Sequence, residues 1–133
     1  MLCRVLIVDD SSLVRTHVRK SFESSPEWQV CGEAGNGKEA VEKAQQVHPD
    51  CIILDLSMPV MNGIEAARIL KKLMPEVPLI MFTSFVTYRL EQEAFAAGVW
   101  RVIGKGDSAS ELVSVARYLA EHAHDPKPSR TRT

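Results

Sequence analysis

The sequence predicts an α/β domain in which helices cover both faces of a central parallel sheet. Short β-rich apolar runs alternate five times with amphipathic stretches, and the runs are almost continuously apolar, as is typical of strands buried on both faces. The 133 residues, with 45% hydrophobic and 25% charged side chains, suffice for one domain whose core needs neither disulfides nor bound metal.

The five expected strands occupy residues 3–8, 28–33, 51–54, 79–82 and 100–103. A helix is expected after each strand. Four of these helices carry apolar residues at helical spacing, whereas the stripe within residues 87–97 is the weakest. The four clear stripes are Val14, Val18 and Phe22; Val41, Ala44 and Val47; Ile64, Ala67, Leu70 and Met74; and Leu112, Val115, Ala116 and Leu119.

Capping and turn residues agree with this division. Asn62 with Glu65, and Ser108 with Glu111, resemble capping boxes at helix starts, and Gly98 stands where a helix should end. Five βα units in about 120 residues favour a doubly wound, flavodoxin-like sheet with strand order 2-1-3-4-5, because an eight-unit barrel would not fit. We expect this domain over residues 1–121, followed by a flexible polar tail or linker stub over residues 122–133.

The polar residues at the expected strand ends form a candidate site. Asp9 and Asp10 follow the first strand, Asp55 the third, Thr83 the fourth and Lys105 the fifth. Three crowded carboxylates repel each other unless a cation is bound, and oxygen ligands without histidine or cysteine favour Mg²⁺. Any one of these acids could simply cap the next helix, but the five residues together point to a functional site.

The order and spacing of these residues resemble the receiver domain of two-component response regulators, the CheY-like superfamily. The resemblance runs from about residue 4 to residue 120 and rests on five pieces taken together. These pieces are Val8-Asp9-Asp10, Ile52-Ile53-Leu54-Asp55-Leu56-Ser57-Met58-Pro59, Met61-Asn62-Gly63, Phe82-Thr83-Ser84 and Ile103-Gly104-Lys105.

The resemblance implies a phosphoacceptor and a metal site. Asp55 would accept a phosphoryl group from a phosphohistidine on a sensor histidine kinase or phosphotransfer protein. Asp10, Asp55 and the backbone carbonyl of Ser57 would hold Mg²⁺, with Asp9 binding through water or supporting Asp10. The chain would then be a signalling domain that catalyses only its own phosphorylation and dephosphorylation.

The resemblance also implies a switch. Thr83 would donate its hydroxyl to the phosphoryl group, and Lys105 would pair with a phosphoryl oxygen. The added charge would draw both inward and alter contacts through the face made by the fourth helix, fifth strand and fifth helix. The expected partners there are a downstream protein target or an output domain, with a homodimer through the same face as an alternative.

The sequence departs from the family pattern in three respects. Val102 stands where an aromatic residue usually lies; strand alternation would put Trp100 on the same face, although buried packing is the simpler account of Trp100. Gly106 replaces a common proline, so the lysine loop is expected to be more mobile. Ser57 and Phe85 occupy positions that usually tune dephosphorylation, and Phe85 either shields the phosphoryl group or packs against the following helix.

Two other classes of protein compete with this interpretation. Residues 32–38 match the first seven positions of a phosphate-binding P-loop, and the strand ending in Asp55 resembles its usual companion. Against a nucleotide-binding protein, Glu39 stands where Ser or Thr should contact Mg²⁺, and the loop follows an expected edge strand. The other class is a receiver-like interaction module without phosphorylation, which Val102 and Gly106 keep open.

The remaining features indicate a cytoplasmic protein without nucleic-acid or membrane partners. The net charge is −1, no apolar run is long enough to span a membrane, and the aspartates come too early for a signal peptide. The three cysteines lack metal-type spacing and suit a reducing compartment. The tail is too short for a helix-turn-helix, and its basic residues are better explained as solvated.

Overall fold

Strands and helices alternate along the chain in the computed structural model, which describes residues 2–107 and 109–123. The strands are β1 (Cys3–Val8), β2 (Trp28–Ala34), β3 (Cys51–Leu54), β4 (Leu79–Thr83) and β5 (Arg101–Gly104). The helices are α1 (Ser12–Glu23), α2 (Gly37–Val47), α3 (Gly63–Leu73), α4 (Tyr88–Ala97) and α5 (Ala109–Glu121). Residues 124–133, most of the predicted tail, lie outside the described residues.

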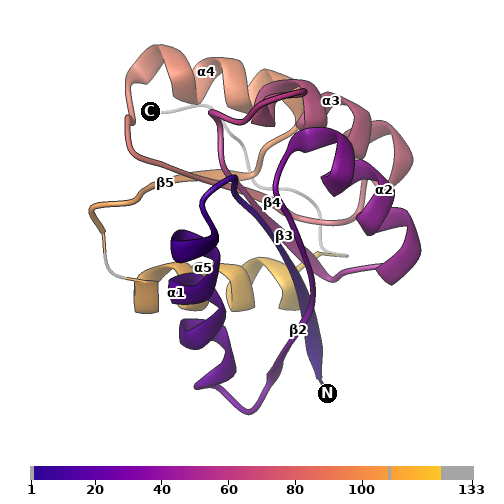
Figure 1. The fold of residues 1–133 in the computed structure, drawn as a ribbon, viewed down its shortest axis with the longest axis vertical. Helices are drawn as coiled ribbons and strands as arrows, with labels where there is room; N and C mark the ends of the chain where they lie inside the picture. Colours follow the sequence, from indigo (N-terminus) through magenta and orange to yellow (C-terminus); the bar gives the residue numbers. More distant parts are fainter. Residues whose placement is uncertain (1, 108, 124–133) are drawn as a thin grey trace.

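The sheet confirms the predicted topology. Its strands pair in the order β2-β1-β3-β4-β5, and every pairing is parallel. Helices α1 and α5 pack on one face, and α2, α3 and α4 lie together on the other (Figure 1). The parallel arrangement brings the carboxyl ends of β1 and β3 side by side, since Val8 of β1 is in register with Leu54 of β3.

A separate buried cluster fills each side of the sheet. The α1–α5 side is built around Phe22, Trp28 and Leu112, and the two aromatic rings meet edge to face with centroids 4.9 Å apart. The other side is built around residues such as Leu70 and Met81. Strand residues alternate between the two clusters, which explains why the predicted strands are apolar along their whole length.

The helix ends follow the expected chemistry. Asn62 and Glu65 form the predicted capping box, with each side chain accepting from the other residue's backbone N–H. Gly98 ends α4 in the left-handed conformation, with φ of 108°. Thr87 caps the start of α4, which is the helix with the weakest apolar stripe. Ser108, the cap expected for α5, lies outside the described residues.

The expected placement of Trp100 beside Val102 is wrong. Trp100 packs in the cluster on the α1–α5 side, together with Ile103, whereas Val102 packs against the cluster on the opposite side. The strand begins only at Arg101 and the chain bends at Trp100, so side-chain alternation does not extend back to the tryptophan. Trp100 is 6% exposed, which agrees with the simpler account of buried packing.

Candidate functional site

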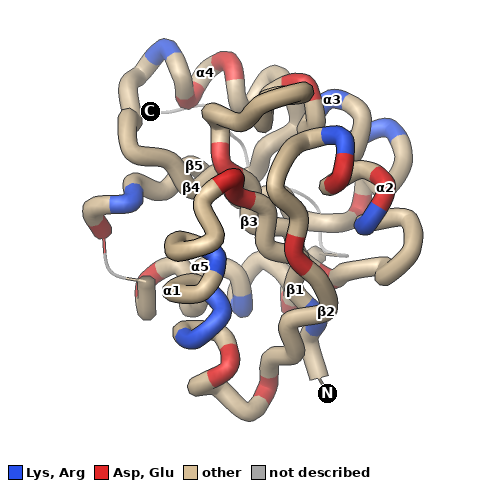
Figure 2. The backbone as a smooth tube through the Cα atoms, viewed as in Figure 1, with Lys and Arg blue, Asp and Glu red and all other residues tan. Residues whose placement is uncertain are grey.

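The carboxyl ends of β1 and β3 bring the three predicted acids together. One carboxylate oxygen from each of Asp9, Asp10 and Asp55 lies within 4.8 Å of the others. Acidic stretches meet at this edge of the sheet in Figure 2. Asp9 and Asp55 are buried, at 3% and 6% exposed, whereas Asp10 faces solvent. Among the described residues this is the one group of three side chains able to hold a metal ion.

Lys105 reaches this acidic group from the loop after β5. Its Nζ lies 2.8 Å from Oδ2 of Asp9 and 3.3 Å from Oδ1 of Asp55. The Lys105 backbone N–H donates to the carbonyl of Thr83 (2.8 Å), and Asp107 N–H donates to the carbonyl of Gly104 (3.0 Å). A hydrogen-bonded turn therefore shapes the lysine loop, and none of the described peptide bonds is cis.

Burial and neighbouring charges shift the pKa values of Asp55 and Lys105. Burial and the neighbouring Asp9 carboxylate raise the pKa of Asp55, although Lys105 and the Leu56 N–H partly oppose them. Burial disfavours the charged ammonium of Lys105, but its bonds to Asp9 and Asp55 outweigh that effect and raise the lysine pKa. One ammonium among three carboxylates leaves a negative pocket of hard oxygen donors, and this donor set suits Mg²⁺.

Gly63 lets helix α3 approach the end of β3. Its N–H donates to the carbonyl of Leu56 (2.8 Å). A Cβ on Gly63 would lie 2.2 Å from the Asp55 carbonyl oxygen, so only glycine fits without moving the backbone. The Leu56 N–H donates in turn to Oδ1 of Asp55 at 2.9 Å. The start of α3 thus packs against the Asp55 backbone, and the Leu56 N–H holds the Asp55 side chain.

The other predicted residues lie around this centre. Thr83 is the last residue of β4, is 4% exposed, and is in register with Gly104. Ser57 is exposed and lines a hollow that Asp10 also lines. Val102 is half-buried in β5, and its side chain packs against the cluster on the α2–α3–α4 side.

A family model described as the response regulator receiver domain matches residues 5–117. The chain belongs to that family. The match covers most of the chain, and the strand order agrees with the receiver fold. Within the described ranges, no helix of the receiver domain has both the length and the apolar character that a membrane span requires.

Known receiver-containing proteins resemble the chain over most of its length. It is 37% identical over 97% of its length to a protein-glutamate methylesterase/protein-glutamine glutaminase from Methanosarcina acetivorans, and covers 38% of that relative. It is 35% identical over 96% of its length to the response regulator protein VraR from Staphylococcus epidermidis, and covers 62% of it. The chain therefore spans only part of the length of these relatives.

Solved receiver structures superpose closely on the chain. The response regulator domain of Thermotoga maritima CheB gives a TM-score of 0.85 at 35% identity, covering 91% of this chain and 98% of that one. A two-component response regulator of the LuxR family from Aurantimonas gives 0.84 at 30% identity, covering 91% and 87%.

The P-loop alternative is wrong for this receiver domain. Residues 32–34 belong to β2, which is the edge strand of the sheet. Glu33 forms ion pairs with Arg15 and Arg19. Gly37 begins α2, and a Cβ there would lie 2.5 Å from the Met61 carbonyl oxygen. Close packing of α2 against the loop before α3 therefore explains this glycine.

Phe85 is not buried against α4. The side chain is 80% exposed on the loop between β4 and α4.

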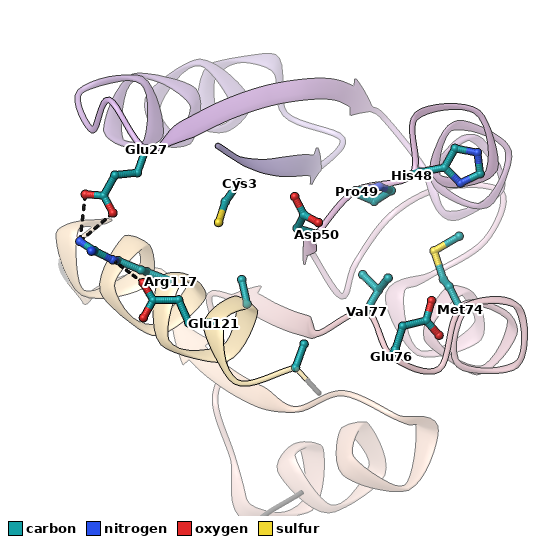
Figure 3. A pocket seen from close by; sticks show the side chains of 12 residues that line it. Cys3, Glu27, His48, Pro49, Asp50, Met74, Glu76, Val77, Arg117 and Glu121 are labelled. Atoms are coloured by element: carbon teal, nitrogen blue, oxygen red, sulfur yellow. Dashed lines mark hydrogen bonds and ion pairs between the residues drawn. The ribbon is translucent and has the colours of Figure 1, made fainter. Parts of the chain in front are cut away.

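A hollow at the opposite, amino edge of the sheet, shown in Figure 3, is lined by residues including Cys3, Asp50 and Val77. Arg117 in that hollow pairs with Glu27 and Glu121 (2.8 and 2.9 Å), far from the candidate site.

Proposed function

We propose that this receiver domain accepts a phosphoryl group on Asp55 in a Mg²⁺-dependent reaction. The observation that carries the proposal is the convergence of three carboxylates and the Lys105 ammonium at the end of β1 and β3. Phosphoryl transfer requires mainly positioning and charge stabilisation. Buried acids that are held by an ammonium and backbone N–H groups are suited to both.

The contacts of Asp55 favour Oδ2 as the reacting oxygen. Lys105 and the Leu56 N–H both bond to Oδ1, and no described group bonds to Oδ2. In the proposed step, Oδ2 forms a bond to phosphorus while the phosphorus–nitrogen bond of the donor phosphohistidine breaks. The leaving imidazole keeps the bonding electron pair and takes up a proton. Lys105 remains paired to the carboxylate and can also pair with a phosphoryl oxygen.

The surrounding residues can hold the ion that this reaction requires. Asp10, Asp55 and the Ser57 carbonyl would hold Mg²⁺, and Asp9 would bind through water or support Asp10. When bound, the ion supplies positive charge that screens the attacking carboxylate and the phosphoryl oxygens. The exposure of Asp10 and Ser57 on one hollow leaves room for the water ligands that Mg²⁺ usually keeps.

The output is a change in protein contacts. Receiver domains interact with histidine kinases and output domains, and the chain fits that general role. In the proposed switch, the charge added at Asp55 draws Thr83 and Lys105 inward and changes the face made by α4, β5 and α5. A downstream protein, an output domain or a second copy of the chain would bind this face. We place the domain in the cytoplasm, where free Cys3, Cys31 and Cys51 would stay reduced.

Intact mass spectrometry tests the proposal directly. The protein is incubated with acetyl phosphate, with and without Mg²⁺. We expect wild type to gain the mass of one phosphoryl group only with Mg²⁺, and Asp55→Asn to gain none. Asp107→Asn is the matched control, because this exposed aspartate lies on the lysine loop and has no proposed acceptor role. Modification that persists in Asp55→Asn would contradict the proposal.

A receiver-like interaction module without phosphorylation is the remaining alternative, because Val102 and the exposed Gly106 depart from the family pattern. The same experiment separates the two. No phosphoryl gain in wild type, together with partner binding that is independent of metal and unchanged in Asp55→Asn, would favour the interaction module.

A further inference from the structure

Arg15 contacts the backbone of the acidic group from helix α1. Its Nη1 donates to the carbonyl oxygen of Asp9 at 2.6 Å, and the side chain is 21% exposed. Arginine is an unfavourable residue so near the start of a helix, because the helix dipole favours negative charge there. The bond to Asp9 offers a reason for a cation at this position.

The contacted carbonyl joins the two acids of β1. The Asp9 carbonyl belongs to the peptide unit that links Asp9 to Asp10, and a peptide unit is planar and rigid. Holding its oxygen therefore orients the Cα atoms of both residues. The Ser11 N–H donates to Oδ1 of Asp9 at 2.9 Å. Hydrogen bonds therefore hold both the carbonyl oxygen and the side chain of Asp9.

Glu33 of β2 holds Arg15 in this orientation. Its Oε1 accepts from Nε of Arg15 at 3.0 Å, and its Oε2 accepts from Nε of Arg19 at 2.7 Å. One carboxylate thus bridges two arginines that lie one helical turn apart on α1. Glu33 lies in the glycine-containing stretch that resembles a P-loop. In this structure the residue pairs with two arginines of α1.

We propose that Arg15 is a positioning residue for Mg²⁺ binding, which orients the Asp9–Asp10 peptide unit and is itself oriented by Glu33. The inference rests on the proposed function, because it concerns the same metal site. Arg15 does not contact the ion or the reacting atoms in this proposal. Its effect passes through the Asp9 carbonyl, as the partners of metal ligands commonly act on metal affinity.

Arg19 provides a matched control for Arg15. Both arginines lie on α1 and pair with Glu33, but Arg19 makes no contact with Asp9. We would measure the Mg²⁺ Kd of the full chain by calorimetry for wild type, Arg15→Gln and Arg19→Gln, with thermal melts of each. We expect Arg15→Gln to weaken Mg²⁺ binding about 10-fold and Arg19→Gln to change it less than about 2-fold, with similar Tm losses in both.

Two further variants keep the test decisive. Arg15→Lys retains a donor that can reach the carbonyl, so we expect a smaller loss of Mg²⁺ affinity than in Arg15→Gln; it also serves if the glutamine variant does not fold. Glu33→Gln keeps the Arg15 charge but weakens its orientation, so its Kd should fall between those of wild type and Arg15→Gln.

The outcomes separate this inference from the proposed function. Wild type that binds Mg²⁺, with Arg15→Gln and Arg15→Lys binding it equally well, would overturn the inference and leave the proposed function intact. Equal weakening in the Arg15 and Arg19 variants would also overturn it, since the effect would then reflect the stability of α1. Wild type that binds no Mg²⁺ would overturn the proposed metal site and, with it, the role of Arg15.

Discussion

The two halves of the carboxyl edge of the sheet are built differently. Around β1 and β3, Asp9 and Asp55 are buried and tied by ion pairs and backbone N–H bonds. Around β4 and β5, Phe85 is 80% exposed, Gly106 is exposed, and Val102 is only half-buried. The first half is thus buried and held by ion pairs and hydrogen bonds, whereas the second is more exposed to solvent. Lys105 connects them, because it lies on the second half and bonds to the first.

Removing the Lys105 ammonium should have the largest effect, on the rate of phosphorylation. Lys105→Met removes the ammonium between Asp9 and Asp55, so we expect phosphorylation by acetyl phosphate to slow about 100-fold at saturating Mg²⁺, the order found when one charge-stabilising donor is lost. Lys38→Met is the control, because Lys38 is exposed on α2, and should react at the wild-type rate. Equal rates in the two variants would show that Lys105 has no part in the transfer.

The close approach of α3 to β3 should give the next largest effect. Gly63→Ala would force a Cβ to 2.2 Å from the Asp55 carbonyl oxygen, so we expect a loss of about 1–3 kcal/mol in the free energy of unfolding and slower phosphorylation. Gly106→Ala is matched to it, since a Cβ there meets nothing within 4 Å, and should change stability by less than about 0.5 kcal/mol. Urea denaturation checks both; equal losses would mean that the two halves are packed alike.

The sequence predicts the first half better than the second, for physical reasons. Strand order and the convergence of Asp10 and Asp55 follow from local apolar patterns and from the geometry of parallel sheets. The predicted placement of Trp100 was wrong because a bend in the chain before β5 turns the Trp100 side chain to the opposite face of the sheet. The alternation of side chains along a strand, as expected from sequence, does not reveal such a bend. Arg15 was missed because its contact with Asp9 depends on how α1 packs, and a charged helix residue is ordinarily expected to be solvated.

Charge in the first half should also affect stability. The pKa of Asp55 is raised by burial and by Asp9, so ionising it costs stability as pH rises above its unfolded value. Asp55→Asn should therefore raise the Tm of the metal-free protein at pH 7 by about 2–4 °C. The difference from wild type should shrink as pH falls toward the ordinary aspartate pKa, where wild-type Asp55 also becomes neutral.

Glu33→Gln should have the opposite effect on thermal stability to Asp55→Asn. Burial opposes ionisation of Glu33, but hydrogen bonds from Arg19 and Arg15 outweigh it and lower its pKa. Its pairing therefore stabilises the fold above the ordinary glutamate pKa and is lost as pH falls below that value. The variant should melt below wild type at pH 7. If Asp55→Asn also melted below wild type, its ion pair with Lys105 would outweigh the cost of burying the carboxylate.

The smallest effect on stability is expected in the second half, at Phe85. Because its side chain is 80% exposed, Phe85→Ala should change the free energy of unfolding by less than about 0.5 kcal/mol. Shielding of the phosphoryl group is the expected role of Phe85 that fits this exposure. Loss of the ring should then speed dephosphorylation, measured as decay of the phosphorylated mass after acetyl phosphate is removed. Tyr88→Ala controls for a general effect of removing an exposed ring, since Tyr88 is 69% exposed at the start of α4. Faster decay in Phe85→Ala alone would show that the open half of the edge, although it contributes little to stability, sets the lifetime of the signal.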